Sequence, residues 1–262
     1  MQTRFRLQAP LGIGPDGAVH RAVADRLGAR PVALRRLPIP AGTARSVLRR
    51  DAETVATLGH PALAVVDDIV DVDDRHVLVA STLGTRGTLA DRLLLGPLPV
   101  DEAVALARTV AEAVDSAHEV GLTHGRITAS NVALTEAGPA VCDLVQSAAL
   151  GRPGDVAADT RDAIRLAASL VAADDRTPRA AAYRALCRDA AAAGVGLDGF
   201  VRALRRIDGT ARDDRPPPTV PVTPPIPVGN VVDDGSVGLV VAVSLAFGVL
   251  VGAIGTVLPA VR

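Results

Sequence analysis

Three glycines near the N-terminus have the spacing of a loop that binds phosphate. Gly12, Gly14 and Gly17, followed by Val19, spell G-x-G-x-x-G-x-V. Glycine lets the backbone approach phosphate oxygens closely and point its N–H groups at them. The motif therefore predicts a phosphate-binding loop, but by itself it also fits a plain hairpin turn.

A dinucleotide-binding loop is another interpretation of the same glycines. Arg35 and Arg36 downstream would then suit the 2′-phosphate of NADP. That interpretation requires a fully buried first strand, whereas residues 4–7 alternate between polar and apolar types, as in a half-exposed strand.

The next strand distinguishes between these alternatives. Pro31-Val32-Ala33-Leu34-Arg35 resembles the V-A-I-K strand that follows the glycine-rich loop of protein kinases. Further kinase-like segments follow in order: Gly59-His60-Pro61, then His124 to Asn131, which aligns with H-R-D-L-x-x-x-N, then Cys142-Asp143-Leu144-Val145, which resembles D-F-G.

This ordered series covers roughly residues 4–208 and resembles the serine/threonine protein-kinase domains of actinobacterial-type bacteria. The resemblance implies that ATP and Mg²⁺ are the ligands of a common site. It assigns the nucleotide to Gly12, Gly14, Gly17, Val19, Ala33 and Arg35, and the metal to Asn131 and Asp143.

Three positions depart from the family pattern. Arg126 stands where the family has its catalytic Asp, Arg35 where it has the strand Lys, and Asp51 where it has the Glu of the C-helix. The chain contains no Lys, so no other strand can supply one. We expect an Arg35–Asp51 pair that holds the helix without supporting chemistry.

The segment between Asp143 and Asp159 is also short, with fifteen residues and no A-P-E motif. In kinases this segment holds the activation loop and the platform for the substrate peptide. The sequence therefore favours a degenerate kinase domain, a pseudokinase.

The fold class that follows is α+β, with two lobes of protein-kinase type. An N-lobe at about 1–81 should contain an antiparallel sheet and one helix at 47–58. A helical C-lobe at about 82–208 should contain helices at 100–120, 160–173, 178–192 and 197–207.

Composition is consistent with a cytosolic globular domain. Because only 2% of residues are aromatic, we expect a core of Ala, Val and Leu. A net charge of −1 argues against nucleic-acid binding. Cys142 and Cys187 lack the spacing of a metal site, and we interpret them as reduced thiols.

The C-terminal part has a different composition. Residues 209–235 include seven prolines between 216 and 227, which predict an extended linker. Residues 236–261 are predicted to form one transmembrane helix, because 237–261 carry no charge and at about 1.5 Å per residue exceed a hydrocarbon core of roughly 30 Å. Small residues on one face could mediate a homodimer: Ser244, Gly248, Gly252 and Thr256.

We therefore expect a single-pass protein of the cell membrane whose kinase-like domain is cytoplasmic, because residues 1–10 lack a signal-peptide core. It would act as a signalling or scaffolding module for an unknown signalling or cell-envelope protein, with ATP binding retained as an option. The alternatives are a weakly active serine/threonine kinase and an NADP-binding enzyme that uses the glycine loop.

Overall fold

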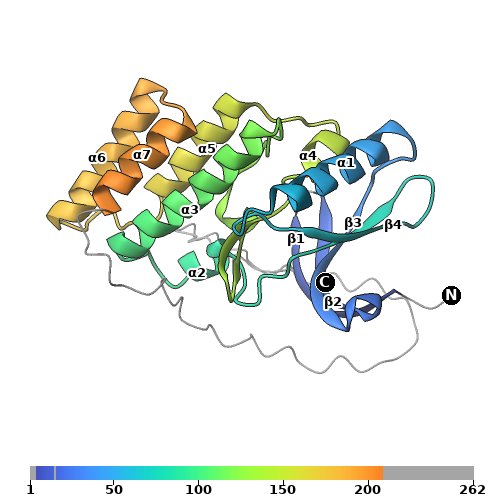
Figure 1. Cartoon of the computed structure of the whole chain (residues 1–262). Coiled ribbons are helices and arrows are strands. Elements are labelled where there is room, and N and C mark those ends of the chain that lie inside the picture. The colour runs from blue at the N-terminus through green and yellow to red at the C-terminus, as the bar shows by residue number, and fades with distance from the viewer. Residues whose placement is uncertain (1–3, 15, 209–262) are drawn as a thin grey trace, which may run out of the picture. The chain divides into compact units, whose positions relative to one another are not determined.

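The computed structural model describes residues 4–14 and 16–208, and it has the expected α+β composition. An antiparallel sheet with one long helix occupies one end, and the other end is helical (Figure 1). This arrangement is compatible with a protein-kinase-like fold.

The larger sheet has five strands in the order β1-β2-β3-β5-β4, all antiparallel to their neighbours. Its first two strands form a hairpin that Gly14 and Gly17 close as a pair. The strand bounds are β1 Phe5–Gly14, β2 Gly17–Ala24, β3 Arg30–Leu37, β4 Val66–Asp71 and β5 Val77–Ser81.

Helix α1, Thr43–Leu58, packs beside this sheet and begins four residues earlier than the sequence predicted. Its buried face contains Leu48, Ala52 and Val55. Gly59 ends it in the left-handed conformation, at φ 63°, which glycine adopts without steric cost.

The helical end is built around α3, which runs from Val100 to Glu119 and buries a stripe of Ala, Val and Leu. Helices α5, α6 and α7 pack around it (Figure 1). Their bounds are Val156–Ala168, Pro178–Ala193 and Leu197–Asp208. The α5 prediction of 160–173 was wrong at both ends, because Asp155 caps the helix by accepting from the Ala158 amide and the chain leaves the helix after Ala168.

Several short elements were not predicted from the sequence, and four of them, α2, η2, β6 and α4, contribute residues to the site described below. They are the 3₁₀ turns η1 Asp25–Leu27 and η2 Ala129–Asn131, the helices α2 Leu89–Leu93 and α4 Gln146–Ala149, and the hairpin of β6 Val132–Thr135 and β7 Gly138–Val141.

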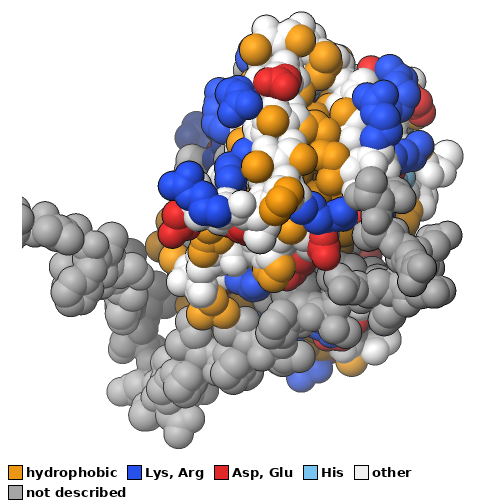
Figure 2. Space-filling model, turned by 90° about the vertical axis from the view of Figure 1, so that its left-hand side faces the viewer, with side chains coloured by type: hydrophobic (Ala, Val, Ile, Leu, Met, Phe, Trp, Pro, Cys, Tyr) orange, Lys and Arg blue, Asp and Glu red, His pale blue; other side chains and the backbone are white. Residues whose placement is uncertain are grey.

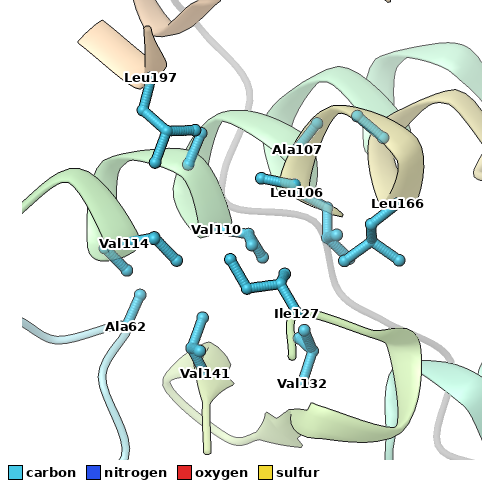
Figure 3. Packing of buried hydrophobic residues seen from close by; sticks show 14 of the residues in the cluster. Ala62, Leu106, Ala107, Val110, Val114, Ile127, Val132, Val141, Leu166 and Leu197 are labelled. Carbon is cyan, nitrogen blue, oxygen red and sulfur yellow. The ribbon is translucent and has the colours of Figure 1, made fainter. Parts of the chain in front are cut away.

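The core confirms the prediction from composition, since it is mainly Ala, Val and Leu. Figure 3 shows Val110 and Val114 of α3 facing the hairpin residues Val132 and Val141. Tyr183 is buried, and its hydroxyl donates a 2.8 Å hydrogen bond to the Ala167 carbonyl, so its polar group has a partner.

Two of the three arginines of α7 form ion pairs. Arg205 lies 2.8 Å from Glu112 of α3, and Arg202 lies 2.8 Å from Asp198. Figure 2 views the α6 and α7 end, where basic and acidic side chains lie next to one another.

The predicted linker at 209–235 and transmembrane helix at 236–261, with its Ser244, Gly248, Gly252 and Thr256 face, lie outside the described residues. Within the described ranges, no helix is long and apolar enough to cross a bilayer. Cys142 and Cys187 are free, as predicted.

Candidate functional site

A cleft of about 410 Å³ lies between the glycine hairpin and the helical end. One part of its wall is apolar and includes Leu11, Val19, Ala33, Leu83 and Ala133. The other part is polar, and its side chains come from β3, the loop before β6 and the segment after β7: Arg35, Arg126, Asn131, Asp143 and Gln146. A cleft with an apolar part and a cluster of convergent polar groups is the usual form of a ligand site.

An ion pair occupies the polar part of the cleft. The Arg35 guanidinium lies 2.6 Å from Oδ2 of Asp143, and both side chains are only 13% exposed. Gln146 completes the cluster, since its amide nitrogen donates to Oδ1 of Asp143 at 3.1 Å and its amide oxygen accepts from Arg35 at 3.1 Å. Both carboxylate oxygens of Asp143 are therefore hydrogen-bonded to protein groups.

At Asp143 this arrangement competes with the binding of a magnesium ion. Mg²⁺ takes a near-octahedral shell of oxygens at about 2.1 Å, and each carboxylate oxygen of Asp143 already accepts one hydrogen bond from the protein. At Asp143 the positive charge that such an ion would supply already comes from Arg35. The second expected ligand, Asn131, donates its amide N–H to the Arg126 carbonyl at 2.9 Å, a bond that does not use its Oδ1, the atom that would coordinate a metal.

Asp143 also has unusual backbone geometry, with φ at 67°. A non-glycine residue in this region is held there by its surroundings. Here the Arg35 and Gln146 bonds hold the side chain, while the backbone N–H of Cys142 donates to the Asn131 carbonyl at 2.9 Å.

Burial, together with the adjacent Asp143 charge, raises the pKa of the Cys142 thiol to about 12, so this cleft thiol stays protonated.

The loop that carries Arg126 is positioned by a buried carboxylate. Asp159 of α5 accepts from the backbone N–H groups of His124 and Gly125, each at 2.7 Å, and lies 3.0 Å from the His118 ring. Burial opposes the charge of Asp159, but these bonds hold its pKa below the usual value. Burial also lowers the pKa of His124, whose Nδ1 accepts from the Arg126 backbone N–H.

Arg126 points toward the glycine hairpin. Its guanidinium lies 3.5 Å from the carboxylate of Asp16, which sits between β1 and β2. Arg152, from the short segment after Asp143, forms an ion pair with the same carboxylate. The tip of the hairpin is thus tied to two arginines of the helical end.

The prediction that Arg35 pairs with Asp51 is wrong. In the described part of the chain, the two side chains have other partners. Asp51 is buried on α1, and its carboxylate accepts from the neighbouring Arg50 at 2.7 and 2.9 Å. Helix α4 packs against α1, and its first residue, Gln146, binds Arg35. Arg35 therefore pairs with Asp143 instead, which the sequence comparison did not foresee.

The short segment itself packs tightly on the loop before β6. A Cβ added to Gly154 would lie 2.5 Å from the Gly125 nitrogen, so the two backbones are in direct contact. The Ser147 hydroxyl donates to the His124 carbonyl at 2.6 Å, and the Thr123 hydroxyl donates to the Gly154 carbonyl at 3.2 Å. These contacts hold the short segment against the loop.

The dinucleotide alternative is inconsistent with the sheet. A dinucleotide-binding loop joins a parallel strand to a helix whose N-terminus faces the pyrophosphate. Here Gly12, Gly14 and Gly17 belong to a hairpin of two antiparallel strands. The NADP-binding interpretation therefore loses its structural basis.

Most of the residues selected from the sequence do line one cleft. Gly12, Gly14, Val19, Ala33, Arg35, Arg126, Asn131 and Asp143 all line it. Gly17 pairs with Gly14 across the turn, and a Cβ added to it would lie 3.3 Å from the Arg36 carbonyl oxygen; Asp51 lies on α1. Sequence reasoning missed Asp16, Gln146 and Arg152; of these, only Asp16 had a visible signal, as an acidic residue within a predicted phosphate loop.

No family model matches this chain. It is similar to the serine/threonine-protein kinase PknL of Mycobacterium tuberculosis, with 32% identity over 142 residues, 53% of this chain and 35% of the relative. The kinase PksC of Streptomyces coelicolor is 30% identical over 146 residues, 52% of the chain and 26% of the relative. PknD of Mycobacterium tuberculosis is 29% identical over 134 residues, 50% of the chain and 20% of the relative.

The chain thus spans about a third or less of the length of these curated relatives. The similarity supports a protein-kinase-like domain of bacterial serine/threonine type. Kinases of this kind use ATP and Mg²⁺ in general.

Proposed function

We propose that this protein is a pseudokinase, a kinase-like binding module that does not transfer phosphoryl groups. The observation that carries the proposal is the cluster of Arg35, Asp143 and Gln146. A kinase needs the carboxylate at the Asp143 position to hold the metal that neutralises the transferring phosphate. In this protein a guanidinium neutralises that carboxylate instead.

The lack of a general base supports the same proposal. Residues 124–131 contain no carboxylate, and Arg126 occupies the position of the family's catalytic Asp. Asp16 is the acidic side chain that approaches Arg126, but Arg126 and Arg152 both hold it. Its oxygens are therefore engaged by cations and do not orient a substrate hydroxyl.

The remaining features of the site, its cleft and its two-ended fold, support a role in binding. The short segment after Asp143 packs onto the loop at Gly125 and offers little length for a peptide platform. The two ends of the fold can still change their arrangement around the cleft when a ligand or a partner binds. Such a change would signal that the ligand or partner is bound. We infer a scaffolding or signalling role, with ATP as the nucleotide that the cleft would take.

The proposal is tested by measuring transfer of labelled γ-phosphate from ATP, with Mg²⁺ or Mn²⁺, to the full-length chain and to a generic protein substrate. We expect no transfer above that of a matched Asp143→Asn variant. Transfer by the wild type that disappears in Asp143→Asn would contradict the proposal and support the weakly active kinase. The variant pair excludes a contaminating kinase, because contamination would label both proteins equally.

We also propose that residues 236–261 anchor the protein in the cell membrane as a single span, with the kinase-like domain cytoplasmic. Their uncharged, apolar composition supports this, and the proline-rich 209–235 would act as the spacer. Tethering would raise the effective concentration of a signalling or cell-envelope partner, and Ser244, Gly248, Gly252 and Thr256 would support a homodimer.

Membrane attachment is tested by extracting cell membranes with alkaline carbonate and then with detergent. We expect the full chain to resist carbonate, whereas a chain that ends at residue 235 is released. Protease added to intact spheroplasts should leave residues 4–208 uncut. Release of the full chain by carbonate, or cleavage in intact spheroplasts, would contradict the anchor or its orientation.

A further inference from the structure

At the tip of the glycine hairpin, the Asp16 carboxylate occupies a position between two arginines that an anionic ligand could also take. Asp16 lies between the guanidinium groups of Arg126 and Arg152, and its side chain is only 13% exposed. An exposed ion pair holds its groups loosely and contributes little. Here the carboxylate itself is mostly buried, while the two guanidinium groups that hold it, from a different part of the fold, are 36% and 52% exposed.

A cavity of about 60 Å³ adjoins this cluster, and Arg126, Asn131 and Asp143 line both the cavity and the larger cleft. The cleft and this smaller polar pocket, which Asp16 also lines, therefore share a wall. A ligand with an apolar ring and an anionic tail would match both parts.

If the Asp16 carboxylate moves away from the two arginines, the remaining charges around the pocket favour the binding of an anion. Arg35 is matched by Asp143 at 2.6 Å, whereas Arg126 and Arg152 share the single charge of Asp16. The other acidic side chain of the cleft, Asp91, accepts from the Thr88 hydroxyl and N–H within the cap of α2. Removing Asp16 therefore leaves two guanidinium groups without a counter-charge from the cleft.

We propose that Arg126 and Arg152 form a binding site for the polyphosphate tail of a nucleotide, that binding needs no divalent metal, and that Asp16 is its built-in competitor. The proposal rests on the pseudokinase assignment, because it takes the cleft as a site of binding without turnover. Guanidinium groups bind phosphate oxygens bidentately and strongly, which replaces the neutralisation that a metal provides elsewhere.

The competition has a direct thermodynamic consequence. While Asp16 holds both arginines, only the open fraction of molecules can bind the anion, and the apparent dissociation constant is raised by that fraction. Anything that releases Asp16 therefore strengthens binding. Nucleotide binding would also detach the hairpin tip from the helical end, which links ligand occupancy to the shape of the cleft.

The test is calorimetric titration of the full-length chain, in mild detergent, with ATP and separately with tripolyphosphate, in EDTA and in excess Mg²⁺. We expect the wild type to bind ATP in EDTA, and Mg²⁺ to leave the affinity unchanged or to weaken it. Asp16→Asn should bind about fivefold more tightly or better, and Arg152→Gln about tenfold more weakly. Tighter binding of ATP than of tripolyphosphate would show that the apolar wall holds the base, whereas equal binding would identify free polyphosphate as a sufficient ligand.

Matched controls distinguish this site from net charge. Asp25→Asn removes the same charge from the opposite end of the same hairpin, where Asp25 pairs with Arg6, and Arg165→Gln removes an arginine that pairs with Asp162 on α5. Both should bind as the wild type does. Thermal melts of all four variants would confirm that they fold.

The proposal is overturned if ATP binds only with Mg²⁺, if Asp16→Asn binds no more tightly than Asp25→Asn, if Arg152→Gln binds as Arg165→Gln does, or if neither the wild type nor Asp16→Asn binds polyphosphate. Each of these failures leaves the pseudokinase assignment intact, because phosphoryl transfer is measured separately.

Discussion

Arg35 of β3 and Asp143, which lie 108 residues apart in the sequence, meet at 2.6 Å in the cleft. The family resemblance assigns phosphate binding to the first position and metal binding to the second. Their direct contact means that each satisfies the charge of the other. The resulting pair links the sheet to the helical end and occupies the place where a kinase would assemble its metal and phosphate.

We predict that this pair stabilises the fold. Replacing Arg35 with Ala leaves the mostly buried Asp143 carboxylate without its cation, and should lower the free energy of unfolding by about 2–4 kcal/mol. Urea denaturation measures the change.

The neighbouring residue on the same strand is the control. Arg36 pairs with Asp73, but both side chains are about half exposed, so Arg36→Ala should cost less than about 1 kcal/mol. Equal losses in the two variants would show that the Arg35–Asp143 contact is not the structural link inferred here.

The contact between Gly154 and Gly125 gives a second prediction. Gly154→Ala would place a Cβ 2.5 Å from the Gly125 nitrogen and force the short segment off the loop, at a cost of about 1–3 kcal/mol. Gly199→Ala in α7 is the matched control, because its Cβ would meet the nearest side chain at an ordinary 3.7 Å and alanine favours a helix. Thermal melts should show a lower midpoint only for Gly154→Ala.

Asp159 should be essential to the loop that carries Arg126. The carboxylate accepts from two backbone N–H groups, and in Asp159→Asn one acceptor oxygen becomes a donor amide that opposes a buried N–H. We expect a loss of about 2–3 kcal/mol, measured by urea denaturation. The cap variant Asp155→Ala, which loses one bond to the Ala158 amide, should cost only about 1 kcal/mol. A smaller loss for Asp159→Asn than for Asp155→Ala would contradict this role.

Stability should also fall in mild acid because of His124. Burial lowers the pKa of this histidine in the folded state, so the unfolded chain binds a proton first as the pH falls below about 6.5. This contribution is fully present above that pH, and below it stability should decline by up to about 1.4 kcal/mol per pH unit. Urea midpoints between pH 7.5 and 5.5 measure the slope, which should be flatter in His124→Gln. The same slope in both proteins would rule out His124 as its source.

The sequence predicted much of the fold because its signals are local. The glycine spacing, the apolar periodicity of α3 and the helix at Pro178 each depend on a few adjacent residues. The β6–β7 hairpin was missed because its strands are only four residues long and Gly138 and Pro139 begin the second. The start of α5 was misplaced because the cap at Asp155 precedes the first recognisable motif residue.

The site was predicted as a set of residues but not as a set of contacts. Motif alignment brought Arg35, Arg126, Asn131 and Asp143 to one cleft. It did not predict that Arg35 pairs with Asp143 rather than with Asp51. This pairing depends on the packing of α4 against α1, which places Gln146 beside Arg35. Arg152 and Asp16 meet only because the short segment folds back over the loop at Gly125.

The most direct test of this account is a titration of the full-length chain with Mn²⁺ in the presence of ATP, followed by electron paramagnetic resonance. We predict that the wild type and Asp143→Asn hold the same amount of Mn²⁺, because Arg35 already occupies the Asp143 carboxylate. A tight Mn²⁺ site in the wild type that disappears in Asp143→Asn would show that the carboxylate binds metal, and would remove the observation on which the pseudokinase proposal rests.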